Sequence, residues 1–213
     1  MATATPTLTL GPADHGRTMT LAEFIAAEWT GGCLYELARG VVDVTQVPGP
    51  NHGLIVMRVA DLFALYHAAH PGVIRYRAGG AECRIRLPGA VSDRHPDHAV
   101  YLLPMPKGAD VWVRWVPQIV VEVVSRRGEK RDFVDKREEY LLFGVLEYWI
   151  IDPRSRKMHV LRRAGGDWRE TVLGEDDILR TDLLPGLAAI VGELLGPPAE
   201  DDDEDNDLDP TPP

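Results

Sequence analysis

The fold is decided by residues 117–153, which read PQIVVEVVSRRGEKRDFVDKREEYLLFGVLEYWIIDP. The apolar, valine-rich run at 119–124 predicts a strand that is buried on both faces. A helix is predicted to follow over 131–143 and to end at Gly144, and a second strand is predicted at about 147–151. Strand, helix and strand in this order indicate an α/β fold.

Similar patterns predict further elements on both sides of this segment. A helix begins at Thr20, where Glu23 completes a capping box, and ends at the glycine pair 31–32. A longer helix runs from an N-cap at Asn51 to about residue 69, and a last helix covers 186–195. The other predicted strands lie at 34–37, 41–47, 73–77, 81–87, 98–103, 157–162 and 168–173. We therefore expect one domain over residues 19–196, with a central mixed β-sheet flanked by helices.

The formal net charge of −10 is concentrated near the C-terminus. Eight of the 33 acidic residues lie between Glu200 and Asp209, which leaves 25 acidic and 23 basic residues elsewhere. This near-neutral body argues against tight nonspecific DNA binding but allows local and transient contact. We expect a flexible arm over residues 1–18 and a disordered acidic tail over residues 197–213. The tail either only solvates the chain or competes with DNA for the active-site cleft.

The cellular compartment is indicated by what the sequence contains and omits. Cys33 and Cys83 lie far apart and form no CxxC motif, which predicts a reducing cytosol without a disulfide framework. The N-terminus lacks the charged and apolar regions of a secretory signal. No apolar run approaches the roughly 18 residues that a membrane span needs. We expect a cytoplasmic protein that does not associate with membranes.

Two carboxylates are the first candidates for chemistry. Glu122 interrupts the apolar run IVVEVV, and a carboxylate at a buried strand position is costly unless it is paired or bound to a metal. Asp97 lies in HPDHAV, where another strand begins. Mg²⁺ binds carboxylate oxygens together with water and substrate phosphates. The alternatives are a buried ion pair with an arginine or an edge strand for Glu122, and an ordinary Pro-Asp turn for Asp97.

The helix after the Glu122 strand supplies a third group. Asp132, Lys136 and Tyr140 are spaced four residues apart and therefore share one face. If this face is turned toward Glu122, the Lys136 ammonium group can position an attacking water or stabilise charge that develops on a phosphate. The spacing alone also allows a solvent-facing pair of Asp132 and Lys136.

The segment PDHAV and the quoted stretch together resemble the Uma family of restriction endonucleases, within the PD-(D/E)XK nuclease superfamily. The upstream segments TLAEFIAAE, YELARGVVDV and PNHGLIVMRVADLF resemble the first half of that family, so the likeness covers about residues 18–195. The resemblance implies a restriction-endonuclease-like fold and a Mg²⁺-dependent endonuclease, with Mn²⁺ as a substitute and DNA as the substrate. It also implies a homodimer, because two symmetric active sites are needed to cut both strands at once.

The family motif can be carried over residue by residue. Asp97 matches its first carboxylate and Glu122 its second, which implies that both bind Mg²⁺. The lysine that the superfamily places two residues after the second carboxylate is replaced here by Val124. The resemblance implies that Lys136, on the following helix, takes over its role at a metal-activated water.

Secondary candidates come from the same resemblance. Glu36 and His52 fall on recurrent family positions, and Glu36 would complete the metal site. Otherwise, Glu36 is a surface charge at a strand end and His52 a polar residue at a helix N-terminus. The loop after the Glu122 strand departs from the family's Ser-Pro-Ser type of turn and carries bases that either contact phosphates or form an ordinary solvated loop. These bases are Arg126, Arg127, Lys130 and Arg131.

Other classes of function stay open at this point. The histidine pairs at 67 and 70 and at 95 and 98 lack a matching second pair, so a zinc site is not indicated. A nuclease fold that is kept as a binding or interaction module, with weak or no catalysis, is favoured by the near-neutral body and by Val124. A metal-dependent phosphatase or an RNA nuclease would use the same residues.

Overall fold

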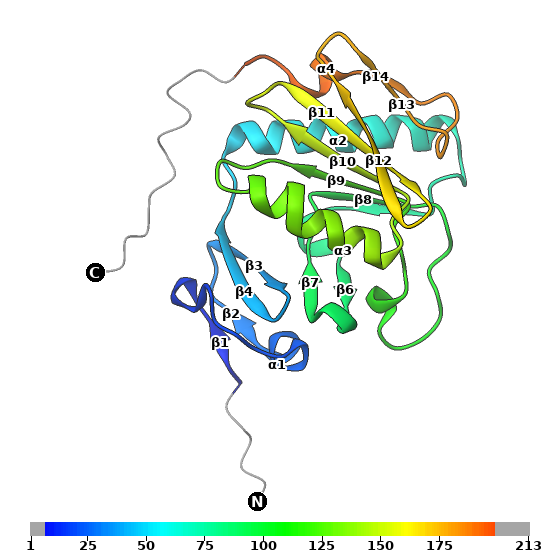
Figure 1. The fold of residues 1–213 in the computed structure, drawn as a ribbon. Helices are drawn as coiled ribbons and strands as arrows, with labels where there is room; N and C mark the ends of the chain where they lie inside the picture. Colours follow the sequence, from blue (N-terminus) through cyan, green and yellow to red (C-terminus); the bar gives the residue numbers. More distant parts are fainter. Residues whose placement is uncertain (1–6, 199–213) are drawn as a thin grey trace, which may run out of the picture.

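The computed structural model describes residues 7–198 of the chain, and its centre is a six-stranded mixed sheet (Figure 1). The strand order is β12-β11-β10-β9-β8-β5. β9 and β10 pair in parallel, and the other neighbours pair antiparallel. The strands are β5 (Tyr76–Ala78), β8 (His98–Tyr101), β9 (Ile119–Val123), β10 (Glu147–Asp152), β11 (Lys157–Ala164) and β12 (Asp167–Leu173). The predicted α/β fold with a central mixed sheet is confirmed.

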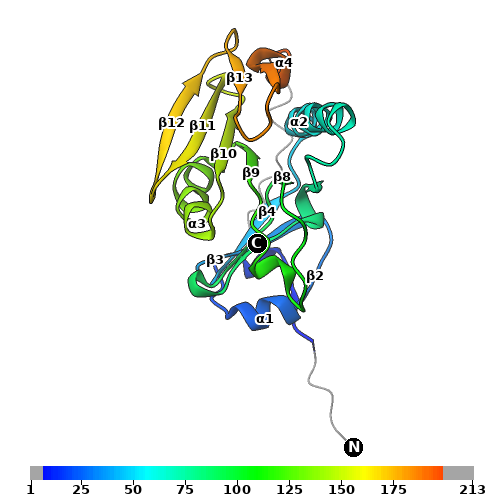
Figure 2. The same ribbon diagram turned by 90° about the vertical axis from the view of Figure 1, so that its right-hand side faces the viewer.

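Two helices cover opposite faces of this sheet (Figure 2). They are α2 (Pro50–Ala69) and α3 (Lys136–Phe143). Val121 of β9 lies in a core with Phe63 of α2, whereas its neighbour Val120 lies in a core with Tyr140 of α3. Because β9 packs against a helix on each of its faces, nearly every one of its side chains is apolar. The strand is therefore recognisable in the sequence.

A smaller antiparallel sheet lies below the central one in Figure 1. Its order is β4-β3-β7-β6, formed by β3 (Cys33–Ala38), β4 (Val41–Gln46), β6 (Ile85–Leu87) and β7 (Ser92–Arg94). Residues 95–97 lead directly from β7 into β8. The junction between the two sheets therefore contains Asp97.

The remaining elements are short. β1 (Thr9–Leu10) pairs in parallel with β2 (Glu28–Trp29), next to α1 (Leu21–Ala26). β13 (Ile178–Arg180) pairs antiparallel with β14 (Ala188–Ile190), and α4 (Val191–Leu195) follows. The 3₁₀-helical turns are Pro12–Asp14, Gly80–Glu82, Pro88–Ala90 and Val111–Val113. No helix in the described part of the chain is long and apolar enough to span a membrane.

The predicted helices are present, but their ends differ from the sequence-based expectation. Thr20 caps α1 through the expected capping box with Glu23, yet the helix ends at Ala26 because the next residues extend into β2. Gly49, not Asn51, occupies the N-cap of α2, since Pro50 takes the first helical position, where its missing N–H costs nothing. Only the end of the predicted helix 186–195 is helical, because residues 188–190 pair with β13.

The described part of the predicted flexible arm over residues 1–18 is packed against the rest of the protein. Leu10 is fully buried in a core with Phe24 and Leu37, and β1 is hydrogen-bonded to β2. The described part of the arm, from residue 7, is therefore packed against the small sheet. Residues 1–6, and all but the first two residues of the predicted acidic tail over 197–213, lie outside the described residues.

Replacement of Phe63 by alanine tests the packing of α2 on the sheet. Phe63 is fully buried, and its ring stacks on Trp149 of β10 with centroids 5.5 Å apart. We expect Phe63→Ala to lower the free energy of unfolding by about 3–5 kcal/mol in urea denaturation. Leu65→Ala in the same helix is the control, because Leu65 is 73% exposed and should change stability by less than about 0.5 kcal/mol. Equal effects of the two substitutions would contradict this packing.

Candidate active site

Asp97 and Glu122 meet on neighbouring strands. Asp97 directly precedes β8, whose first residue, His98, pairs with Val121 of β9, next to Glu122. Both side chains line one cavity of about 220 Å³. The Asp97 carboxylate accepts a hydrogen bond of 2.7 Å from the backbone N–H of Val123. The structure thus brings the two predicted carboxylates to one place.

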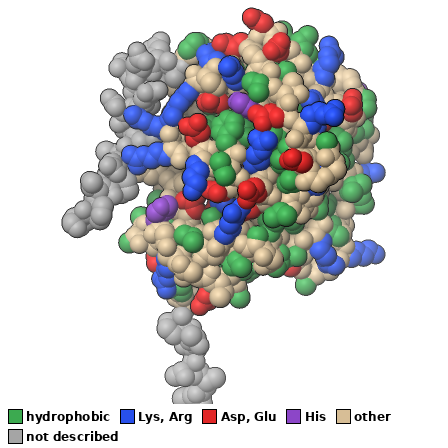
Figure 3. Space-filling model, in the orientation of Figure 1, with side chains coloured by type: hydrophobic (Ala, Val, Ile, Leu, Met, Phe, Trp, Pro, Cys, Tyr) green, Lys and Arg blue, Asp and Glu red, His purple; other side chains and the backbone are tan. Residues whose placement is uncertain are grey.

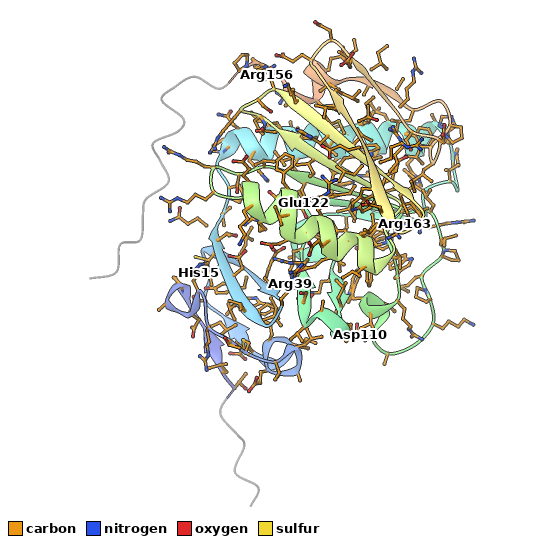
Figure 4. The ribbon with its side chains drawn as sticks, viewed as in Figure 1. His15, Arg39, Asp110, Glu122, Arg156 and Arg163 are labelled. Carbon is orange, nitrogen blue, oxygen red and sulfur yellow. The ribbon has the colours of Figure 1, made fainter. Side chains whose placement is uncertain are left out.

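Glu122 lies beside α3 in Figure 4 and is held by two side chains of that helix. Its side chain is almost completely buried, and its Oε1 atom accepts hydrogen bonds from Lys136 Nζ at 2.9 Å and from the Tyr140 hydroxyl at 2.5 Å. Both donors come from α3 and lie four residues apart, as the predicted shared face requires. The buried partner of Glu122 is therefore a lysine, and neither an arginine pair nor a solvated edge strand explains this residue.

Lys136 is shared by several carboxylates. Its Nζ atom lies 3.4 Å from Glu36 Oε1 and 3.9 Å from Asp132 Oδ1, in addition to its contact with Glu122. Asp132 belongs to a π-helical turn, Arg131–Asp135, that leads into α3, and its Oδ2 atom is buried without a hydrogen-bond partner. A single ammonium group is thus the common neighbour of three buried acids.

The close packing of these buried charges shifts the pKa values of Glu122, Lys136 and Glu36. Burial raises the pKa of Glu122 to about 8, despite the opposing effect of Lys136. Burial acts in the other direction on Lys136, but the surrounding carboxylates hold the pKa of that ammonium group above its usual range. Glu36 is also buried, yet Lys136, Arg94 and Arg131 lower its pKa to about 2. Lys136 is therefore charged and Glu36 ionised at neutral pH, and Glu122 is the acid that retains a proton most readily.

Arg94 is a second buried cation that the sequence patterns did not reveal. It is fully buried and donates from Nε to Glu139 of α3 at 2.7 Å and from Nη1 to Glu36 of β3 at 3.2 Å. Arg94 therefore ties the small sheet to the helix that carries Lys136. Hydrophobic periodicity cannot detect it, because β7 consists of polar residues (Ser92, Asp93 and Arg94) that are nevertheless buried.

His52 joins Asp97 to the backbone of β9. Its Nε2 atom lies 3.2 Å from Asp97 Oδ2 and 3.1 Å from the Val123 carbonyl oxygen, so one imidazole nitrogen is the common neighbour of both oxygens. Across residues 7–198 no group of three His, Cys, Asp or Glu side chains is arranged to hold a metal ion. Mg²⁺ commonly uses one or two carboxylates and keeps several waters, so Asp97 and Glu122, which both line the cavity, have the donor chemistry that it requires.

The other predicted residues lie in different places. Arg131 lines the cavity, whereas Arg126, Arg127 and Lys130 are exposed and lie outside its lining. Glu36 also lines the cavity, but its contacts are with cations and with the backbone N–H of His95. Val124 packs in the apolar core beneath α3, which explains in physical terms why the lysine comes from the helix and not from this strand position.

Gly79 positions Asp97 through the backbone, which was not anticipated. A Cβ atom at residue 79 would lie 1.9 Å from the Asp97 carbonyl oxygen, so no larger residue fits without moving the Asp97 backbone.

We expect Gly79→Ala to destabilise the fold by about 1–3 kcal/mol in urea denaturation, as overpacking does. Gly53→Ala in α2 is the control, because open space surrounds Gly53 and alanine favours a helix, so stability should rise by up to about 1 kcal/mol.

The raised pKa of Glu122 predicts a pH-dependent stability. Its pKa is about 8 in the folded state against 4.5 for the free side chain, so folding takes up a proton between these values. The stability that this group contributes is fully present below pH 4.5 and is lost as the pH rises toward 8. Glu122→Gln should remove this slope, which urea denaturation of both proteins across this range would detect. A difference between them that does not change with pH would contradict the assignment.

Comparison with known proteins shows the family of this chain. The model of the family Uma2, described as "Putative restriction endonuclease", matches residues 21–192. A crystal structure from Anabaena variabilis ATCC 29413, described as "a putative nuclease belonging to DUF820", superposes with a TM-score of 0.65 and 18% identity, over 83% of this chain and 97% of that chain. At this identity the likeness shows a common fold. No curated protein is similar enough to match. Since the family model spans most of the sequence, the chain belongs to the Uma2 family.

Proposed function

We propose that this protein is a Mg²⁺-dependent endonuclease that hydrolyses the phosphodiester bonds of DNA. The observation that carries the proposal is the meeting of Asp97, Glu122 and Lys136 in one cavity, at the junction of β8, β9 and α3. Membership of a family described as restriction endonucleases supports the reaction class. The metal and the DNA substrate are our own inference from the chemistry of these residues.

Asp97 and Glu122 would hold the Mg²⁺ ion. When bound, Mg²⁺ stabilises negative charge on a phosphate and lowers the pKa of a water molecule that it contacts. His52 fixes one oxygen of Asp97, and the backbone N–H of Val123 donates to the same oxygen. These contacts leave the carboxylate in a single orientation, which is the condition for a preorganised site.

Lys136 has two tasks in this proposal. Its hydrogen bond holds the Glu122 carboxylate, and its charge provides a fixed cation where negative charge develops on a phosphate. Of the four basic residues predicted to contact phosphates after β9, Arg131 is the one that lines this cavity and is therefore the best placed to do so. Tyr140, on the same helix, donates to the same oxygen of Glu122 and so helps to fix its orientation.

The surface charge fits local contact with nucleic acid. On the face shown in Figure 3, the described acidic, basic and apolar side chains are interspersed, and no continuous basic area is visible there. Binding would then depend on the cavity and its metal ion more than on long-range attraction. For cleavage of both strands we propose that two copies act together as a homodimer, since each copy contributes one such site.

Substitution of the three central residues tests the proposal. We expect Asp97→Asn, Glu122→Gln and Lys136→Met each to reduce Mg²⁺-dependent plasmid nicking by about 10²-fold or more, because each removes a charged group from the reacting centre. Calorimetry with Mg²⁺ on the same samples should show weaker binding for the two carboxylate variants. Asp61→Asn is the matched control, since Asp61 is an exposed acid on α2 outside the cavity.

Each outcome leads to a different conclusion. Nicking by the wild type that survives in all three variants would disprove the assignment of the site. Mg²⁺ binding without any nicking would favour an interaction module, or a phosphatase or RNA nuclease, which a panel of RNA and phosphate monoester substrates would separate. Absence of Mg²⁺ binding by the wild type, even with DNA present, would make Glu122 a structural residue.

A further inference from the structure

One wall of the cavity consists of planar side chains. Trp29 is 40% exposed and stacks on Tyr35, with ring centroids 6.2 Å apart and planes inclined by 15°. The Arg84 guanidinium group lies over the Trp29 ring, 5.8 Å from its centroid. All three residues line the same cavity as Asp97 and Glu122. The hydrolytic chemistry proposed above makes no use of this wall.

The wall is held in place by its own contacts. The Tyr35 hydroxyl is within 2.9 Å of Thr30 Oγ1, and the Arg84 side chain lies 3.5 Å from the buried Asp93 carboxylate. Trp29 also packs on Phe24, with centroids 5.8 Å apart. Trp29 keeps 40% of its surface exposed beside these partners, so another planar group can contact this wall of aromatic and guanidinium planes. Stacking on aromatic rings and on arginine planes is how proteins hold unpaired bases.

The size of the cavity limits what can lie against this wall. At about 220 Å³ it is smaller than the roughly 300–1,000 Å³ of pockets for drug-sized ligands, so it suits one planar ring system. A paired base is stacked inside a duplex and cannot present its face to a protein wall. An unpaired base can do so, and the phosphate attached to it would remain near the carboxylates and Lys136, which line the same cavity.

We infer that Trp29, Tyr35 and Arg84 form a stacking site for one unpaired nucleobase, so that the substrate is single-stranded or locally unpaired nucleic acid. The inference rests on the proposed function for the position of the phosphate. It also accounts for the near-neutral body, because stacking supplies affinity that does not depend on an extended basic surface.

The experiment compares two oligomers that carry the same phosphates. A fluorescent oligothymidylate and an abasic oligomer of equal length are titrated with protein in EDTA, and binding is followed by anisotropy. We expect the wild type to bind oligothymidylate about 5- to 150-fold more tightly than the abasic oligomer, the range that stacking of one base provides. Trp29→Leu should bind both alike, and Trp29→Phe should restore part of the difference.

Controls separate stacking from a loss of structure. Trp112→Leu is the matched control, because Trp112 is a partly buried tryptophan that does not line the cavity, and it should retain the difference between the oligomers. Unfolding curves in urea verify that Trp29→Leu is folded, and Trp29→Phe gives a second readout if it is not. Equal binding of both oligomers by the wild type, or no binding of either, would overturn the inference.

Cleavage assays with Mg²⁺ distinguish this inference from the function on which it rests. Cleavage of duplex DNA that Trp29→Leu leaves unchanged, without a base-dependent difference in binding, would overturn the stacking site and support the nuclease. Base-dependent binding that is lost in Trp29→Leu, with no cleavage of any oligomer, would support the stacking site and contradict the nuclease.

Discussion

The contact between Lys136 and Glu122 is the interaction on which the rest of the site depends. A carboxylate inside a buried strand is costly to leave uncompensated, and a cation on the next helix offsets part of that cost. The parallel pairing of β9 with β10 makes this possible, because the chain must cross over the sheet between the two strands, and α3 lies in that crossover. The same crossover helix therefore connects the two parallel strands and supplies Lys136 to Glu122.

The same logic extends to the smaller sheet through Arg94. Glu36 of β3 contacts both Arg94 and Lys136, so one acid joins the two buried cations, while Glu139 binds Arg94 from α3. Buried ion pairs thus connect the smaller sheet to α3. A junction of this kind tolerates little displacement, because removing any partner leaves a buried charge unpaired. It fixes α3, and with it Lys136, relative to Asp97.

Local patterns predicted the central part of this arrangement and missed its surroundings. Glu122 was detectable because it interrupts an apolar run, and the four-residue spacing identified Lys136 and Tyr140 on one helix face. Arg94 and Gly79 gave no signal, since their importance comes from contacts with residues far away in the sequence. Strand β14 and the ends of the helices were also misplaced, because pairing with a distant strand overrides local propensity there.

The charges that line the cavity suggest how a cation there would favour the binding of a phosphate. The acids of the lining are Glu36, Asp97 and Glu122, and its basic residues are Arg84, Arg131 and Lys136. Burial raises the pKa of Glu122 to about 8, so this acid keeps a proton at neutral pH. A divalent cation that replaced this proton would make the cavity more positive and more attractive to a phosphate, so that metal and substrate would each favour the binding of the other. In a protein whose body is almost neutral, such coupling would strengthen the binding of nucleic acid at the site where it can be cut.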